Sequence, residues 1–247
     1  MISRPKYDLE VFSTPASLYE AAAEFIIRLS NKTVAQKGNF SIALSGGETP
    51  KGLFNLLAQA SYGQRLPLQN IFVFWGDERC VLLNDQRNNA FQARSLWLDK
   101  SGIPSRNIYP IPVDHQPAEA ARLYAKTIQE QFNNKEPVFD LILLGLGENG
   151  HTASLFPNTP VLQAQEKTVR EVYVEEEKMY RITMTAALIN QSQAVLFLVS
   201  GSGKAAVLDK ILNAPYQPEQ YPAQLIHPVH GDLYFFADAG AAAAIRE

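Results

Sequence analysis

Five short runs that are apolar at almost every position recur along this chain, and they limit its possible folds more than any other feature. A strand without polar positions must be covered on both faces, which is typical of parallel sheets flanked by helices. The runs are SIAL before Ser45, IFVFW ending at Trp75, FDLILLG ending at Gly145, AVLFLVS ending at Ser200, and DLYFFAD near the C-terminus. They predict a mainly parallel sheet of buried strands.

Segments with helical periodicity separate these runs, at residues 17–35, 52–60, 89–98, 118–132 and 204–212. The alanine-rich residues 241–244 predict one more helix. This order predicts an α/β fold, a three-layer αβα sandwich with a Rossmann-like sheet. Because the chain has 247 residues and its proline-rich loops are too short for linkers, we expect a single domain over residues 1–247.

Composition excludes several classes of partner. The formal net charge is -3, so the chain lacks the basic field that nucleic-acid binding needs. Cys80 is the only cysteine, which rules out an internal disulfide and fits a reducing compartment. The first residues lack a signal-peptide core, and no segment reaches the ~20 apolar residues of a membrane span. We therefore expect a cytoplasmic protein with no membrane partner.

The turn after the first run reads SGGETPKGLF. Here Ser45, Gly46, Gly47 and Thr49 follow a strand, and Pro50 is predicted to open a helix. Glycines let a backbone approach an anion closely, and a helix N-terminus offers unpaired N–H groups. The pattern predicts a phosphate cradle. The alternative is an ordinary turn with Thr49 as N-cap and Pro50 as the first helical residue.

Charged residues follow other runs. Asp77, Glu78 and Arg79 crowd after the second run, and such carboxylates beside a guanidinium shift one another's pKa and bind polar substrates. The alternative is a solvated turn with a surface ion pair. Lys204, in SGSGKA, starts a predicted helix, and Arg181, in RITMT, precedes another. Both would serve the same anion, although a solvated lysine at a helix start is the alternative for Lys204.

The turn after the third run, GLGENGHTASLFP, presents a histidine at the carboxyl edge of the sheet, where open α/β sheets bind ligands. Gly147 and Gly150 place His151 near a predicted helix start. An imidazole suits general acid–base chemistry, and the alternative is a hydrogen-bonded structural histidine. GLGENG also matches a dinucleotide fingerprint, but Pro157 would cut short its helix, so no dinucleotide site is expected.

Other catalytic motifs are missing from the sequence. GSGKA lacks the Ser or Thr of a P-loop, and no GxSxG nucleophile elbow occurs. His227 and His230 have no acidic or cysteine partner at a ligand spacing, and we interpret them as loop residues. No metal site is expected.

In this order, SGGETPKGLF, WGDER, GLGENGHTASLFP, RITMT and SGSGKA closely resemble the motifs of the 6-phosphogluconolactonase family, from about residue 40 to Ala239. The superfamily also includes glucosamine-6-phosphate deaminases, but DER and HTASLFP look like the lactonase versions. The resemblance implies a fold related to the deaminases. It also implies hydrolysis of 6-phospho-D-glucono-1,5-lactone to 6-phospho-D-gluconate in the oxidative pentose phosphate pathway, without metal or organic cofactor. We expect a small-molecule substrate and a monomer.

The implied reaction needs a general base, a hydrogen-bond donor to the oxyanion and a binding site for the phosphate. A lactone is an activated ester, so His151 is predicted to act as general base on water. N–H groups of the glycine turn or the Arg79 guanidinium would stabilise the oxyanion, and Asp77 belongs to the same catalytic set. The predicted phosphate-binding residues are Ser45, Gly46, Gly47, Thr49, Arg79, Arg181 and Lys204.

Asn149 departs from the family pattern, which usually has Asp two residues before the histidine. An amide keeps a hydrogen bond to the imidazole but loses the charge, which predicts a weaker base. We expect turnover to persist because lactones are reactive. The alternatives are a deaminase-like isomerase that releases ammonia from glucosamine 6-phosphate, and a sugar-phosphate sensor that binds without turnover.

Overall fold

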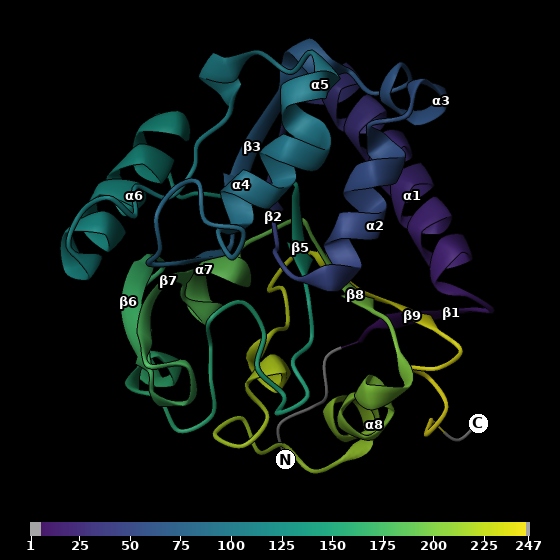
Figure 1. Ribbon diagram of the computed structural model, residues 1–247, viewed down its shortest axis with the longest axis vertical. Helices are drawn as coiled ribbons and strands as arrows, with labels where there is room; N and C mark the ends of the chain where they lie inside the picture. The colour runs from purple at the N-terminus through teal and green to yellow at the C-terminus, as the bar shows by residue number, and fades with distance from the viewer. Residues whose placement is uncertain (1–5, 246–247) are drawn as a thin grey trace.

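Six parallel strands form the central sheet of the computed structural model, which describes residues 6–245 (Figure 1). Every neighbouring pair is parallel, which confirms the predicted sheet and its five apolar strands. The sequence did not predict β1, because its residues are exposed or half-buried and form no apolar run. In spatial order the strands are β1 (Asp8–Phe12), β9 (Asp232–Asp238), β8 (Ala194–Val199), β5 (Leu141–Leu144), β2 (Phe40–Leu44) and β3 (Ile71–Trp75).

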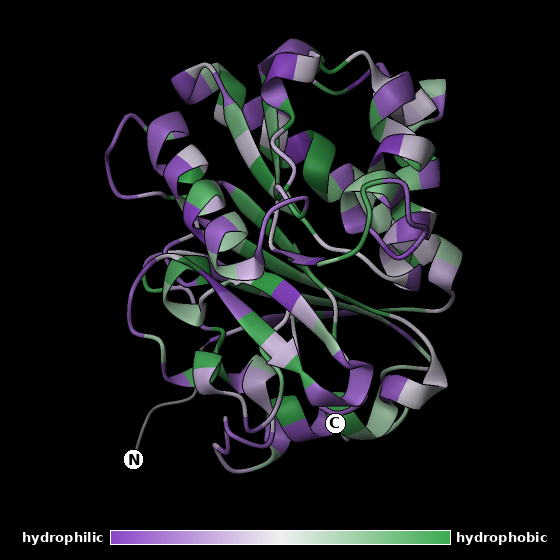
Figure 2. Cartoon of the chain, turned by 60° about the vertical axis from the view of Figure 1, so that its left-hand side comes forward, coloured by the Kyte–Doolittle hydropathy of each residue, from purple (hydrophilic) through white to green (hydrophobic). Residues whose placement is uncertain are grey.

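Helices cover both faces of this sheet. α1 (Pro15–Lys37) and α2 (Glu48–Leu57) lie on one side of β8 and β9, and α8 (Ala205–Asn213) lies on the other (Figure 1). Figure 2 shows apolar strands in the centre and mostly polar residues on the outer helices. This confirms the three-layer α/β arrangement. The remaining helices are α3 (Ala60–Gly63), α4 (Asn89–Ala93), α5 (Asp99–Ser101), α6 (Pro117–Gln131) and α7 (Ala186–Ile189), with a π-helical turn (Arg94–Leu98) joining α4 to α5.

The ends of α1 show why the chain folds locally as predicted. Thr14 is its N-cap and accepts a hydrogen bond from the Ser17 N–H at 3.1 Å, while Pro15 occupies the first helical position. Gly38, at φ 85°, ends the helix in the left-handed conformation. The chain then enters β2, whose five residues are all buried.

A second sheet of three antiparallel strands joins the edge of the first, with β4 (Asp77–Arg79) next to β7 (Met179–Met184) and β6 (Val169–Val174) outermost. The sequence predicted none of these strands, because β4 has only three residues and polar residues interrupt β6 and β7. In register, Asp77 lies opposite Thr183 and Arg79 opposite Arg181. Since alternate residues of a strand share a face, these four side chains point to the same side of the small sheet.

The start of α2 differs from the prediction. Gly47, at φ 100°, is the N-cap, so the helix begins at Glu48 and not at Pro50. Thr49 therefore lies inside the first turn and is not the cap. Glycine tolerates this positive φ, and the chain turns into the helix earlier than the proline indicated.

Two other predicted helices are wrong. Turns follow His151, where Ala153 adopts φ 48° and Thr152 forms an isolated bridge with Leu155. Residues 241–244 also form turns, and the Ala241 N–H donates to the Asp238 carboxylate at 2.7 Å. A tract this short does not repay the cost of helix nucleation, despite its alanines.

Tyr124 of α6 bonds the end of β3, the edge strand of the sheet. Its hydroxyl accepts from the Trp75 N–H at 2.8 Å and donates to the Trp75 carbonyl at 3.1 Å. We expect Tyr124→Phe to lower the free energy of unfolding, measured in urea, by about 1–3 kcal/mol, because buried backbone groups lose their partner. Tyr109→Phe is the control, since the Tyr109 hydroxyl bonds only the exposed Gln131 side chain. Equal losses in the two variants would contradict this prediction.

Candidate active site

A cavity of about 340 Å³ lies at the carboxyl ends of the central strands. Loops after β8, β5 and β2, together with β4 directly after β3, form its walls, and these four strands are neighbours in the order β8-β5-β2-β3. This is where parallel sheets bind ligands. The cavity brings together all the predicted site residues except Asn149, which lies beside His151: Ser45, Gly46, Gly47, Thr49, Asp77, Arg79, His151, Arg181 and Lys204.

The loop after β2 leaves the start of α2 open to the cavity. The N-cap Gly47 provides no side-chain bond, and both glycines of the loop line the cavity wall. The first N–H groups of a helix have no partner within it, and its dipole favours an anion there. Ser45 and Thr49 place hydroxyl groups at the same wall. The geometry therefore fits the predicted phosphate cradle.

Two guanidinium groups enter the cavity from adjacent strands, because Arg79 and Arg181 are paired across β4 and β7. Arg181 is only 4% exposed and forms ion pairs with Asp77, at 3.5 Å, and with Glu177. It also lies over the Phe156 ring at 5.1 Å. The charge of Arg181 is thus largely offset inside the protein. Asp77 is committed to this pair, and it also accepts a hydrogen bond from the Ser154 hydroxyl at 2.6 Å.

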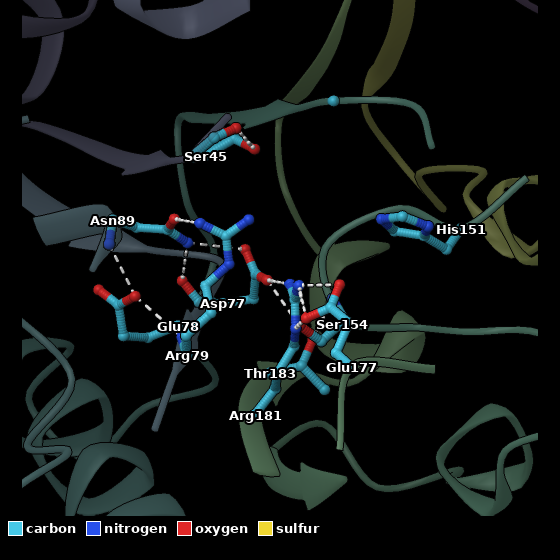
Figure 3. Close-up of polar contacts among 12 residues, drawn as sticks. Ser45, Asp77, Glu78, Arg79, Asn89, His151, Ser154, Glu177, Arg181 and Thr183 are labelled. Carbon is cyan, nitrogen blue, oxygen red and sulfur yellow. Dashed lines mark hydrogen bonds and ion pairs between the residues drawn. The ribbon is translucent and has the colours of Figure 1, made fainter. Parts of the chain in front are cut away.

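Arg79 is held differently. Its Nη1 donates to the Asn89 Oδ1 at 2.8 Å and to the Arg87 carbonyl at 2.9 Å. Both acceptors are neutral, and within residues 6–245 Arg79 forms no ion pair. Figure 3 shows Arg79 and Asn89 on one side of the cavity and His151 on the other.

His151 is oriented by Asn149 and packed against Phe156. Its Nδ1 lies 2.6 Å from the Asn149 Oδ1, and because an amide oxygen only accepts, Nδ1 must carry the proton. The Nε2 lone pair is then available as a base. The ring stacks on Phe156 with centroids 4.0 Å apart. A Cβ on Gly147 would lie 2.1 Å from Nδ1, so only glycine fits beneath the ring.

The surroundings keep the His151 imidazole neutral. Burial lowers its pKa, the Arg181 charge lowers it further, and the carboxylates of Asp77 and Glu177 only partly oppose them, so the pKa is about 4. The neutral form therefore dominates near pH 7. A half-buried imidazole with a free Nε2 can accept a proton from water or from a bound hydroxyl.

Glu78 lies outside the cavity lining and has a structural position. It is fully buried and accepts hydrogen bonds from the N–H groups of Arg79, Asn89 and Ala90 at 2.7–2.9 Å. Burial raises its pKa to about 7, although the three N–H groups oppose the rise. Glu78 thus ties β4 to the start of α4. The predicted group of two carboxylates and an arginine is divided, with only Asp77 and Arg79 in the cavity.

Three residues near the site were missed by the sequence reasoning. Asn89 and Ser200 line the cavity, and Glu177 pairs with Arg181. Glu177 comes from the turn between β6 and β7, and the unpredicted pairing of those strands brings it close. Asn89 follows the N-cap Asn88. The repeated asparagine was a visible signal, since the cap needs only one of the two.

Comparison with known proteins identifies the family of this chain. Residues 13–235 match the family model described as glucosamine-6-phosphate isomerases/6-phosphogluconolactonase. The chain belongs to this family. A 6-phosphogluconolactonase of Synechocystis sp. is 39% identical over 242 residues, which cover 96% of this chain and 98% of that protein. One of Nostoc sp. is 36% identical over 244 residues, with coverage of 97% and 99%.

A solved structure extends the comparison. The 6-phosphogluconolactonase from Trypanosoma brucei has a TM-score of 0.85 and 27% identity, and the match covers 98% of this chain and 100% of that one. The family resemblance read from the motifs is thereby confirmed. No helix within residues 6–245 has the length and apolar character to cross a bilayer. The same residues contain no cluster of three or more His, Cys, Asp or Glu side chains placed to hold a metal ion.

The titration of His151 tests the electrostatics of the cavity. We expect its ring protons to shift in NMR spectra with a midpoint near 4, well below the ordinary 6.5, because burial and Arg181 disfavour the imidazolium. The chain has 4 histidines, and His151→Gln identifies the signal. A midpoint near 6.5 would contradict the described environment.

Proposed function

We propose that this protein hydrolyses 6-phospho-D-glucono-1,5-lactone to 6-phospho-D-gluconate, the second step of the oxidative pentose phosphate pathway. One observation carries the proposal: a neutral histidine with a free Nε2 lines a cavity that also contains Arg79, Arg181 and the open N-terminus of α2, in a chain 39% identical, over nearly its whole length, to a protein named 6-phosphogluconolactonase. The family also includes glucosamine-6-phosphate isomerases. The two named relatives favour the lactonase.

His151 acts as the general base. Its Nε2 removes a proton from water as the water oxygen attacks the C1 carbonyl, and negative charge then develops on the carbonyl oxygen. N–H groups of the glycine turn stabilise this charge. When the tetrahedral intermediate collapses, the C1–O5 bond breaks and the imidazolium returns its proton to the leaving ring oxygen. The low pKa of His151 makes it a weak base but a strong acid for this second transfer.

The phosphate binds at the other end of the cavity. The cradle of Ser45, Gly46, Gly47 and Thr49 accepts it, and Arg79, which has no carboxylate within ion-pair distance among residues 6–245, supplies a positive charge. Arg181 and Lys204 add to the positive field, although Arg181 is already paired and Lys204 Nζ lies 3.9 Å from Glu148. Holding the phosphate fixes the position of C1 relative to His151, which lowers the entropic cost of the reaction.

We further propose that the protein works as a monomer on this small molecule in the cytoplasm, without nucleic acid.

The decisive assay supplies freshly made 6-phosphogluconolactone to the wild type, to His151→Ala and to the control His227→Ala, an exposed loop histidine. We expect His151→Ala to lower kcat by about 100-fold or more, because the base is lost, and the control to match the wild type. Equal rates for wild type and His151→Ala would contradict the assigned base.

Ammonia release from glucosamine 6-phosphate would favour the isomerase. Binding of 6-phosphogluconate with lactone loss at the buffer rate would favour the sensor.

Asn149 variants test whether an amide suffices beside the base. Asn149→Asp keeps an acceptor for Nδ1 and adds a charge, so it should raise the His151 pKa and move the acidic limb of the kcat/KM profile toward neutral pH. We expect its kcat to rise by no more than about tenfold. Asn149→Ala removes the acceptor and should lower kcat by about tenfold or more. A far larger rise for Asn149→Asp would show that the natural chain is an impaired enzyme.

A further inference from the structure

Asn89 is fixed more firmly than its place in the chain requires. It is the first residue of α4, whose N-cap is already Asn88. Yet it is 1% exposed, its N–H donates to the Glu78 carboxylate at 2.7 Å, and its Nδ2 donates to the Asp77 carbonyl at 2.9 Å. These bonds fix the amide, so the position of its Oδ1 is determined.

That oxygen determines the direction of Arg79. Nη1 has two hydrogens, and the bonds to the Asn89 Oδ1 and the Arg87 carbonyl use both. Nη2 has no acceptor within residues 6–245. Nε is buried without a partner, a cost that the contacts at Nη1 must offset. Repulsion from Arg181, directly opposite, would otherwise turn the guanidinium away.

Asn89 also contacts the cradle. A Cβ on Gly46 would lie 1.8 Å from the Asn89 Oδ1, so the amide occupies the space that a side chain at Gly46 would need. The same oxygen therefore touches the backbone of the cradle and the guanidinium of Arg79. One anion beside Gly46 can then meet backbone N–H groups and Nη2 together.

We propose that Asn89 is a positioning residue, which aims Arg79 at the phosphate of the ligand and, because its amide is neutral, adds no negative charge beside the guanidinium. The proposal rests on the proposed function for the identity of the ligand. A carboxylate in place of Asn89 would hold Arg79 equally well but would cancel the charge that the phosphate needs. The amide of Asn89 orients the Arg79 guanidinium without neutralising its charge.

Calorimetric binding of 6-phosphogluconate, the product of the proposed reaction, tests this coupling. We expect Asn89→Ala and Arg79→Ala each to raise the Kd by about tenfold or more. The double variant should bind no more weakly than Arg79→Ala alone, within about twofold, because Asn89 acts only through Arg79. Wild-type affinity in Asn89→Ala, or losses that multiply in the double variant, would overturn the proposal.

Asn107→Ala is the matched control. Asn107 is an asparagine of similar burial, 3% exposed, and its Nδ2 bonds the carbonyls of Gln69 and Ile71 at the opposite end of β3. We expect this variant to lose stability in urea but to keep the wild-type Kd; an equal rise in its Kd would make the effect of Asn89 merely structural and overturn the proposal. A wild type that does not bind 6-phosphogluconate would also overturn it. A wild type that binds the product but leaves the lactone unhydrolysed would overturn the proposed function alone.

Discussion

The pairing of β4 with β7 is the constraint on which the rest of the site depends. It places Arg79 directly opposite Arg181, so two like charges share one face of a small sheet inside a cavity. Such a pair is unfavourable unless each charge has a partner. The two arginines have different kinds of partner. Arg181 receives two carboxylates, whereas Arg79 receives only carbonyl oxygens. The result is a cavity with one guanidinium held in ion pairs and one held by neutral acceptors, which is the one that we propose contacts the ligand.

The same electrostatics explain the histidine. A cavity that attracts anions is unfavourable for an imidazolium, and burial beside Arg181 keeps His151 in the neutral form that a base requires. A carboxylate at residue 149 would raise the basicity of the ring, but it would also add negative charge to a cavity that we propose binds a phosphate. Asn149 orients the ring through Nδ1 and adds no charge. With the amide, His151 is a weaker base, but its imidazole stays neutral over a wider pH range. A weaker base suffices in the proposed reaction because a lactone is an activated ester.

Much of the fold was predictable from the sequence because continuous apolar runs are a strong signal for buried parallel strands. Most of the polar cavity-lining residues were predictable for the same reason: the carboxyl ends of those strands must meet at one edge. The small sheet was not, since β4 consists of three polar residues whose pairing depends on a partner about 100 positions later, which composition does not reveal. Asn89 was missed because only the fold of α4 brings it to the cavity, and Glu177 was missed because only the pairing of β6 with β7 brings it to Arg181. The start of α2 was misplaced because Pro50 indicated the first helical residue, whereas the positive φ that makes Gly47 the N-cap is not visible in the sequence.

The order of the strands also explains how two ends of a ligand are held at a fixed separation. The cradle follows β2, the histidine turn follows the neighbouring β5, and Arg79 follows β3 on the other side of β2. Hydrogen bonds hold neighbouring strands of one sheet about 4.8 Å apart. The groups at the ends of these strands therefore keep a fixed separation. Contacts between loops then refine the arrangement, with Asn89 filling the space above Gly46 and His151 filling the space above Gly147. In both places a glycine is needed because a functional side chain from elsewhere occupies the position of its missing Cβ. The glycines of these turns therefore leave room for Asn89 and His151, and this packing helps to fix the proposed phosphate cradle relative to the proposed general base.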